Sequence, residues 1–259
     1  MNHSLSDCRN RWFAGKHDQF RLQGVYTGND LAWNGFTAHS ISGQLLSIPS
    51  DPRGISGDIH CLSLSQDCDL LSCLLLDISG HGPAIAALSE RIEAPLKNML
   101  DDRDNRKLLT ALNKLLVDME LAGQFATAIA GTFDMTSRIW RYAYAGHPNM
   151  LLLENGSWSE LSDVGDHGIP AGIVADAMFY QYERKLTAGD RLLLYTDGAT
   201  DIRLSAGTRL GTQGLVDMLN ALGPGDPHTT IVRLIDGLVE INASDVFVDD
   251  ITLLLLECM

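Results

Sequence analysis

The chain has 259 residues, 45% of them hydrophobic, and carries a formal net charge of −14 at pH 7. It is long enough for one large domain or two small ones with an apolar core. The negative charge argues against nucleic acid and anionic membranes as partners, because both repel an acidic surface. The apolar stretches are shorter than the ~18 residues that a transmembrane helix needs, and residues 1–7 do not resemble a secretory signal.

The cysteines indicate a reducing compartment. There are five of them, Cys8, Cys61, Cys68, Cys73 and Cys258. Their number is odd and no two have the Cys-x-x-Cys spacing of many zinc and redox sites. We therefore expect free thiols in a cytoplasmic protein.

The N-terminal segment, residues 1–35, is too short for a separate sensor domain. It mixes aromatic residues, glycines and charges, which is compatible with strands or with an extension packed on the main domain. From residue 36 to residue 259, short apolar runs alternate with turn residues and helical patterns, and we place the main domain there.

The order of the predicted elements favours an α+β domain of stacked layers over a Rossmann arrangement. Pro83 is suited to the first turn of a helix, and Asn155-Gly156 is a strong signal for a hairpin turn. In chain order, strands are predicted at 36–40, 45–48, 58–64 and 70–76; helices at 83–99 and 108–119; strands at 126–133, 138–144, 150–153, 158–161 and 192–195; helices at 215–222 and 229–241; and a last strand at 251–256.

Four aspartates lie at the ends of apolar runs. Asp58 and Asp249 precede such runs, whereas Asp77 and Asp197 follow them. The end of one antiparallel strand lies beside the start of its neighbour, so the four carboxylates are expected to meet at one sheet edge. A single aspartate at a strand end is more often a turn former or cap. Carboxylates packed together, however, repel one another unless a cation neutralises them, and oxygen ligands suit Mg²⁺ or Mn²⁺.

Five motifs in order resemble those of the metal-dependent protein phosphatases (PPM, type 2C-like). The bacterial branch that includes SpoIIE, RsbU and RsbX is the most similar, and the resemblance extends from residue 37 to the C-terminus. The motifs are Gly57-Asp58, Asp77-Ile78-Ser79-Gly80-His81-Gly82, Ala145-Gly146-His147-Pro148, Tyr195-Thr196-Asp197-Gly198 and Asp249-Asp250-Ile251-Thr252.

This resemblance implies a four-layer α-β-β-α sandwich of two antiparallel sheets flanked by helices, with a site for two Mn²⁺ or Mg²⁺ ions at one sheet edge. Asp77 would bridge the two ions, and the main-chain carbonyl of Ile78 would bind one of them. Asp197 and Asp249 would ligate the other ion. Asp58 would hold a metal-bound water or ligate directly. A metal-bridging hydroxide would then attack the phosphorus of a phosphoserine or phosphothreonine.

Gly80 and His81 lie at the start of the helix expected at Pro83. This position could bind phosphate or let His81 donate a proton to the leaving oxygen, although a Gly-His-Gly turn is also compatible with a purely structural link. Ser79 and His81 do not form a nucleophile elbow, because Gly-x-Ser-x-Gly is absent. We interpret His147 as structural or orienting.

The resemblance implies a protein serine/threonine phosphatase in the stress-response control of sigma factors, and its partner would be a phosphorylated STAS-domain antagonist of an anti-sigma factor. A homodimer is also compatible with it. Two alternatives stay open. One is a binding module that keeps the fold without catalysis and sequesters a signalling partner, and the other is a metal-dependent hydrolase of a small phosphate ester. The presence of all four aspartates argues against the binding module.

Overall fold

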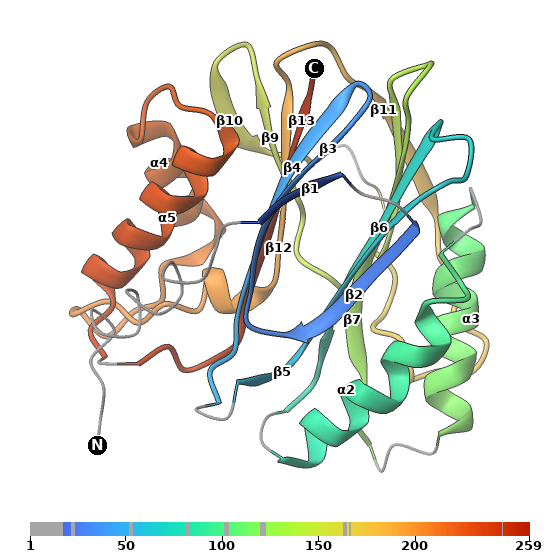
Figure 1. Ribbon diagram of the computed structural model, residues 1–259. Coiled ribbons are helices and arrows are strands. Elements are labelled where there is room, and N and C mark those ends of the chain that lie inside the picture. Colours follow the sequence, from blue (N-terminus) through green and yellow to red (C-terminus); the bar gives the residue numbers. More distant parts are fainter. Residues whose placement is uncertain are drawn as a thin grey trace.

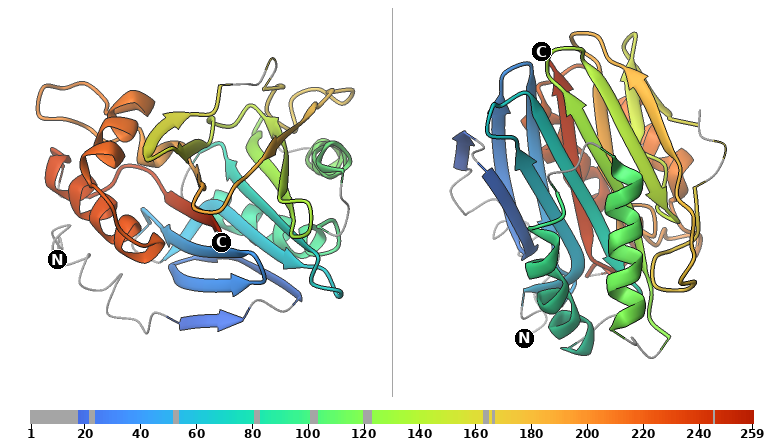
Figure 2. Two further views of the ribbon diagram at one scale, coloured as in Figure 1. Left: turned by 90° about the horizontal axis from the view of Figure 1, so that it is seen from above. Right: turned by 90° about the vertical axis from the view of Figure 1, so that its right-hand side faces the viewer.

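The computed structural model describes residues 18–21, 24–51, 54–80, 83–100, 104–119, 123–162, 165, 167–244 and 246–259. Two β-sheets stack face to face, and helices cover the outer face of each sheet (Figure 1). Seen from above in Figure 2, the helices lie at the two outer sides and the strands between them. The four-layer α-β-β-α sandwich expected from the sequence is confirmed.

In the part of the chain that the structure describes, the first sheet has seven strands. Neighbouring strands in it run antiparallel, except that its edge strand is parallel to the next one. In spatial order the strands are β1 (Asp18–Arg21), β3 (Ala32–Ala38), β4 (Ile41–Ile48), β13 (Ile251–Cys258), β12 (Arg191–Tyr195), β9 (Leu151–Glu154) and β10 (Ser157–Glu160).

Among the described residues, the second sheet has six strands, and all of its neighbouring pairs are antiparallel. In spatial order they are β11 (Gln181–Lys185), β8 (Ile139–Ala145), β7 (Ala126–Asp134), β6 (Leu70–Ile78), β5 (Ile55–Leu64) and β2 (Gly24–Asp30). Strand β11 was not predicted, because Gln-Tyr-Glu-Arg-Lys has no apolar pattern and lies at the sheet edge, where it buries little.

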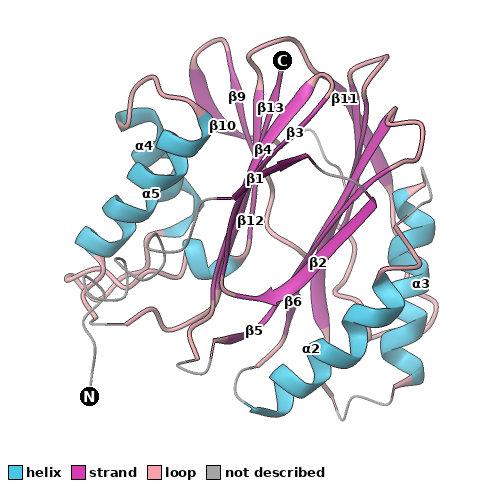
Figure 3. Cartoon of the chain, viewed as in Figure 1, coloured by secondary structure: helices cyan, strands magenta, loops and turns pink. Residues whose placement is uncertain are grey.

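Helices α2 (Pro83–Leu96) and α3 (Asn105–Asp118) cover the six-stranded sheet, and α4 (Gly211–Ala221) and α5 (Pro227–Ile241) cover the seven-stranded one (Figure 3). The side chains of Asp104 and Asp226 cap α3 and α5 by accepting bonds from main-chain N–H groups of the first turn. No helix in the described part of the chain is long and apolar enough to cross a membrane.

Both faces of the central strands are buried, which explains their continuous apolar sequences. In β6, Leu71, Cys73 and Leu75 point into the core between the sheets, whereas Leu74 and Leu76 point towards α2 and α3. This alternation follows from the two-residue period of a strand. The hairpin of β5 and β6 is therefore held in one register by packing on both faces.

The N-terminal segment contributes strands to both sheets. Strand β2 pairs with β5, and β3 pairs with β4. The boundary placed between residues 35 and 36 lies inside β3. Residues 1–17 lie outside the described residues.

Candidate metal centre

The four aspartates singled out in the sequence lie at the same end of the sandwich. Asp58 and Asp77 are direct Cα partners across the β5–β6 hairpin. Asp197 begins the short 3-10 helix η1 (Asp197–Ala199), two residues after the end of β12. Asp249 lies two residues before β13, which is the antiparallel neighbour of β12. The sheet topology therefore brings together acids that are up to 191 residues apart in the chain.

Burial raises the pKa of three of these carboxylates, and the charges of neighbouring acids add to the rise. Burial raises the pKa of Asp77 to about 7, and the charges of Asp197, Asp249 and Asp250 add to the shift. Burial also raises the pKa of Asp249 to about 6, with a contribution from Asp197. The pKa of Asp197 is raised as well, chiefly by burial. A bound cation would relieve this repulsion.

The donor set fits hard divalent cations. Carboxylate oxygens are the usual protein ligands of Mg²⁺ and suit Mn²⁺ too. Within the described ranges, no three His, Cys, Asp or Glu side chains converge as they do in a complete metal cluster. The charges of Asp197 and Asp249 nevertheless reach Asp77 and raise its pKa.

Asp58 differs from the other three acids because it points into the interior. Its side chain is only 2% exposed, and its Oδ2 accepts hydrogen bonds from the hydroxyls of Thr196 at 2.7 Å and Thr252 at 2.8 Å. Burial, followed by the charge of Asp77, raises its pKa well above the ordinary value. The sequence motifs contained both threonines, but nothing in the local pattern indicated that they contact Asp58.

Asp250 is a further acid of this region that the sequence analysis did not single out. Its Oδ1 accepts from the Ser50 amide at 2.6 Å and the Ser50 hydroxyl at 2.8 Å, and its Oδ2 accepts from the Gly57 amide at 2.7 Å. Asp250 therefore fastens the start of β13 to the segment that carries Asp58. The only signal in the sequence was its place beside Asp249.

The remaining candidates of the Asp77 motif have different environments. The side chain of Ile78 is buried, and Gly80 has φ +102°, a left-handed conformation that favours glycine. His81 lies outside the described residues. Ser79 is engaged in structure, because its amide donates to the Phe125 carbonyl at 2.8 Å and its hydroxyl accepts from the Phe125 amide at 2.9 Å.

His147 is buried, and its Nδ1 lies 2.9 Å from the hydroxyl of Thr127. Burial lowers its pKa to about 3, so the ring is neutral at physiological pH. Thr127 is the β7 partner of Asp77. The contact therefore supports the β-strand next to Asp77, in agreement with the structural or orienting interpretation of His147.

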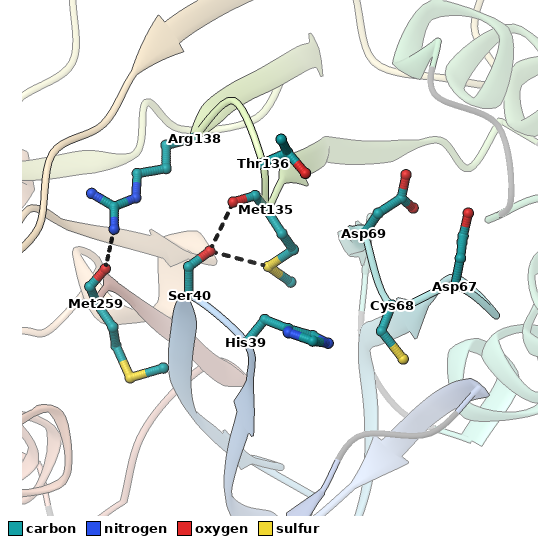
Figure 4. A pocket seen from close by; sticks show the side chains of 9 residues that line it. All are labelled: His39, Ser40, Asp67, Cys68, Asp69, Met135, Thr136, Arg138 and Met259. Atoms are coloured by element: carbon teal, nitrogen blue, oxygen red, sulfur yellow. Dashed lines mark hydrogen bonds between the residues drawn. The ribbon is translucent and has the colours of Figure 1, made fainter.

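A pocket of about 590 Å³ lies at the opposite end of the sandwich. Figure 4 shows the side chains that line it. It is formed by the β3–β4, β5–β6 and β7–β8 turns and by the C-terminal residue. Ser65 at the β5–β6 turn is seven positions beyond Asp58, which is roughly 23 Å along the strand at about 3.3 Å per residue. The pocket therefore does not belong to the acidic site.

A protein-family model matches the part of the chain that contains most of the candidate metal ligands. The model is described as Stage II sporulation protein E (SpoIIE), and it matches residues 69–259. The chain belongs to the SpoIIE family. Only Asp58 among the four aspartates precedes the matched segment.

Two proteins of Bacillus subtilis (strain 168) are similar to this SpoIIE-family chain. Phosphoserine phosphatase RsbU is 24% identical over 164 residues, which cover 62% of this chain and 47% of RsbU. Phosphoserine phosphatase RsbP is 27% identical over 152 residues, which cover 57% of this chain and 37% of RsbP. The matches thus span less than half the length of each relative.

Solved structures of low sequence identity have the same fold. The SiaA-PP2C domain of Pseudomonas aeruginosa has a TM-score of 0.72 at 20% identity and covers 83% of this chain and 84% of that one. The structure of the RsbU and RsbW domains of Rv1364c from Mycobacterium tuberculosis has a TM-score of 0.68 at 22% identity. The match covers 93% of this chain and 62% of that one. The structure of RsbX in complex with magnesium has a TM-score of 0.62 at 15% identity. The match covers 88% of this chain and 100% of that one.

Proposed function

We propose that this chain is a Mn²⁺- or Mg²⁺-dependent protein phosphatase that hydrolyses phosphoserine or phosphothreonine. The observation that carries the proposal is the placement of Asp58, Asp77, Asp197 and Asp249 at one end of the sandwich, where the charges of Asp197 and Asp249 raise the pKa of Asp77. Membership of the SpoIIE family and the similarity to RsbU and RsbP support this chemistry. The substrate that follows from the resemblance is a phosphorylated STAS-domain antagonist of an anti-sigma factor.

In this proposal Asp77, Asp197 and Asp249 hold two divalent cations, together with the carbonyl of Ile78. When bound, such ions lower the pKa of water and offset the charge of a phosphoryl group. The protein contributes orientation, because each aspartate is fixed by a strand or by the turn next to it. Asp58, the direct cross-strand partner of Asp77, is buried, and hydrogen bonds from two threonine hydroxyls keep its carboxylate in one orientation.

The test is phosphate release from p-nitrophenyl phosphate and from a phosphoserine STAS protein, in Mn²⁺, Mg²⁺ or EDTA. We expect turnover only with metal, and a preference for the protein substrate. Asp77→Ala and Asp197→Asn should lose turnover while staying folded. Asp217→Asn is the matched control, because Asp217 is exposed on α4 and contacts Gln213 there.

Other outcomes separate the alternatives. An inert wild-type chain that still binds the STAS protein tightly would identify a binding module. Metal-dependent turnover of p-nitrophenyl phosphate without turnover of any phosphoprotein would favour a small-ester hydrolase. Equal activity of Asp197→Asn and Asp217→Asn would refute the proposed site.

A further inference from the structure

A buried hydroxyl network joins the two sheets at the acidic end. Thr196 follows β12 and Thr252 is part of β13, whereas Asp58 belongs to β5 of the opposite sheet. The two threonines are fully buried, and both donate to the same oxygen of Asp58. The network therefore crosses the interface between the sheets, where an unpaired polar group would be costly.

The direction of every proton in this network follows from the bonds. The Thr196 hydroxyl donates its single proton to Asp58 and accepts from the Thr252 amide at 2.9 Å. The Thr252 hydroxyl also donates to Asp58, so the Ser47 hydroxyl, 3.3 Å away, is the donor in their contact. The Oδ2 of Asp58 thus receives two hydrogen bonds, which occupy both of its lone pairs.

We propose that Thr196 and Thr252 are positioning residues that occupy Oδ2 of Asp58 and leave Oδ1 as the only oxygen it presents to a bound cation or water. This inference rests on the proposed function and adds two residues to its site. Asp58 would then bind through one oxygen, either directly or through water, and could not chelate with both.

The same two threonines link Asp58 to the other acids. Thr196 directly precedes Asp197, and Thr252 lies three residues after Asp249. The main chains of the two segments are also bonded, because the Thr196 amide donates to the Thr252 carbonyl at 3.0 Å. A displacement of Asp58 would therefore be transmitted to two further candidate ligands. Groups that orient a metal ligand typically change metal affinity or activity by about 10- to 100-fold when they are removed.

The experiment compares Thr196→Val and Thr252→Val with Thr196→Ser and Thr252→Ser in the full chain. Valine removes the hydroxyl, whereas serine keeps it. The readouts are Mn²⁺ affinity by calorimetry, the Mn²⁺ dependence of the thermal midpoint, and turnover at saturating Mn²⁺. We expect the valine variants to bind Mn²⁺ about 10- to 100-fold more weakly and the serine variants to stay near wild type.

Ser47→Ala is the matched control. Ser47 is fully buried in the same network but contacts Thr252 and not Asp58. We expect it to lower the urea midpoint with little change in Mn²⁺ affinity. Should a valine variant not fold, the corresponding alanine variant, which leaves room for a water, replaces it in the comparison.

Folded valine variants that bind Mn²⁺ like wild type would overturn the inference, and so would an equal loss of affinity in Ser47→Ala. Either result would leave the proposed function intact, because the wild-type chain would still bind metal and turn over substrate. A wild-type chain with neither Mn²⁺ binding nor turnover would instead refute the proposed function, and this inference with it.

Discussion

Replacing Asp77 with asparagine should stabilise the metal-free protein at pH 8, although it removes a residue of the proposed centre. The pKa of Asp77 rises from 3.8 to about 7, first through burial and then through the charges of Asp197, Asp249 and Asp250. The ionised carboxylate is therefore unfavourable in the folded state. Asparagine has nearly the same shape without the charge.

The magnitude follows from the size of the shift. Roughly three pH units at about 1.4 kcal/mol each correspond to about 4 kcal/mol at pH 8. Because Asp77 and Asp249 share their repulsion, we expect a gain of about 2 to 4 kcal/mol. The sign follows from linkage: the folded state binds the Asp77 proton more tightly than the unfolded state, so stability falls as pH rises from about 4 to about 7.

The assay is urea unfolding of wild type and Asp77→Asn in EDTA at pH 5 and pH 8. The stability difference should be less than half as large at pH 5 as at pH 8, because the penalty for the ionised carboxylate builds up between about pH 4 and about pH 7. Mn²⁺ should then stabilise wild type and leave the variant unchanged, since only wild type retains this ligand.

Asp226→Asn is a control for which we expect the opposite change, a lower free energy of unfolding at pH 8. Hydrogen bonds from the main chain at Thr229 lower the pKa of Asp226 at the start of α5, so loss of its charge should weaken the protein slightly at pH 8. The reasoning about Asp77 would be refuted if Asp77→Asn were less stable than wild type at both pH values in EDTA.

Three further predictions concern the same region and its support. A Cβ at Gly198 would lie 1.9 Å from the Asp250 carbonyl oxygen. Gly198→Ala should therefore lower the free energy of unfolding in urea by about 1–3 kcal/mol and weaken Mn²⁺ binding. Gly165→Ala is the control and should do neither, because a Cβ there would have nothing within 4 Å. Asp249→Asn should also stabilise the EDTA-treated protein at pH 8, by less than Asp77→Asn, because its pKa rises only to about 6. Asn113→Ala removes three hydrogen bonds between α3 and residues 172–175. The variant should lose about 2 kcal/mol of unfolding free energy, and proteolysis of residues 172–175 should become faster. Unchanged proteolysis would contradict this prediction.

Local patterns in the sequence were sufficient for much of the fold. The apolar run after Pro83 predicted α2, and the paired runs around residues 66–69 predicted the β5–β6 hairpin. Asp58 before one apolar run and Asp77 after the next were expected to meet at one sheet edge, and they are direct Cα partners. These features were readable because they depend on neighbours within a few residues or across one tight turn.

The formation of strand β11 and of the N-terminal strands could not be predicted from the local sequence, because it depends on pairing within the sheets. The sequence of β11 is polar, and it becomes a strand by pairing with β8 at the sheet edge. Strand β2 pairs with β5, and its sequence contains two glycines that weaken any local preference for a strand. Strand formation at an edge is decided by the available neighbour more than by the segment itself.

The sequence by itself determined which residue types carry the chemistry, namely aspartates placed at strand ends. Only the tertiary structure decided how Asp58 is held, because its partners Thr196 and Thr252 are 138 and 194 residues away, the first directly after β12 and the second in β13. The tertiary structure also decided that Asp250 accepts hydrogen bonds from the amides of Ser50 and Gly57. The physical reason is that side-chain periodicity records which face of a strand is buried, whereas the contacts across two packed sheets depend on how the sheets are stacked and aligned.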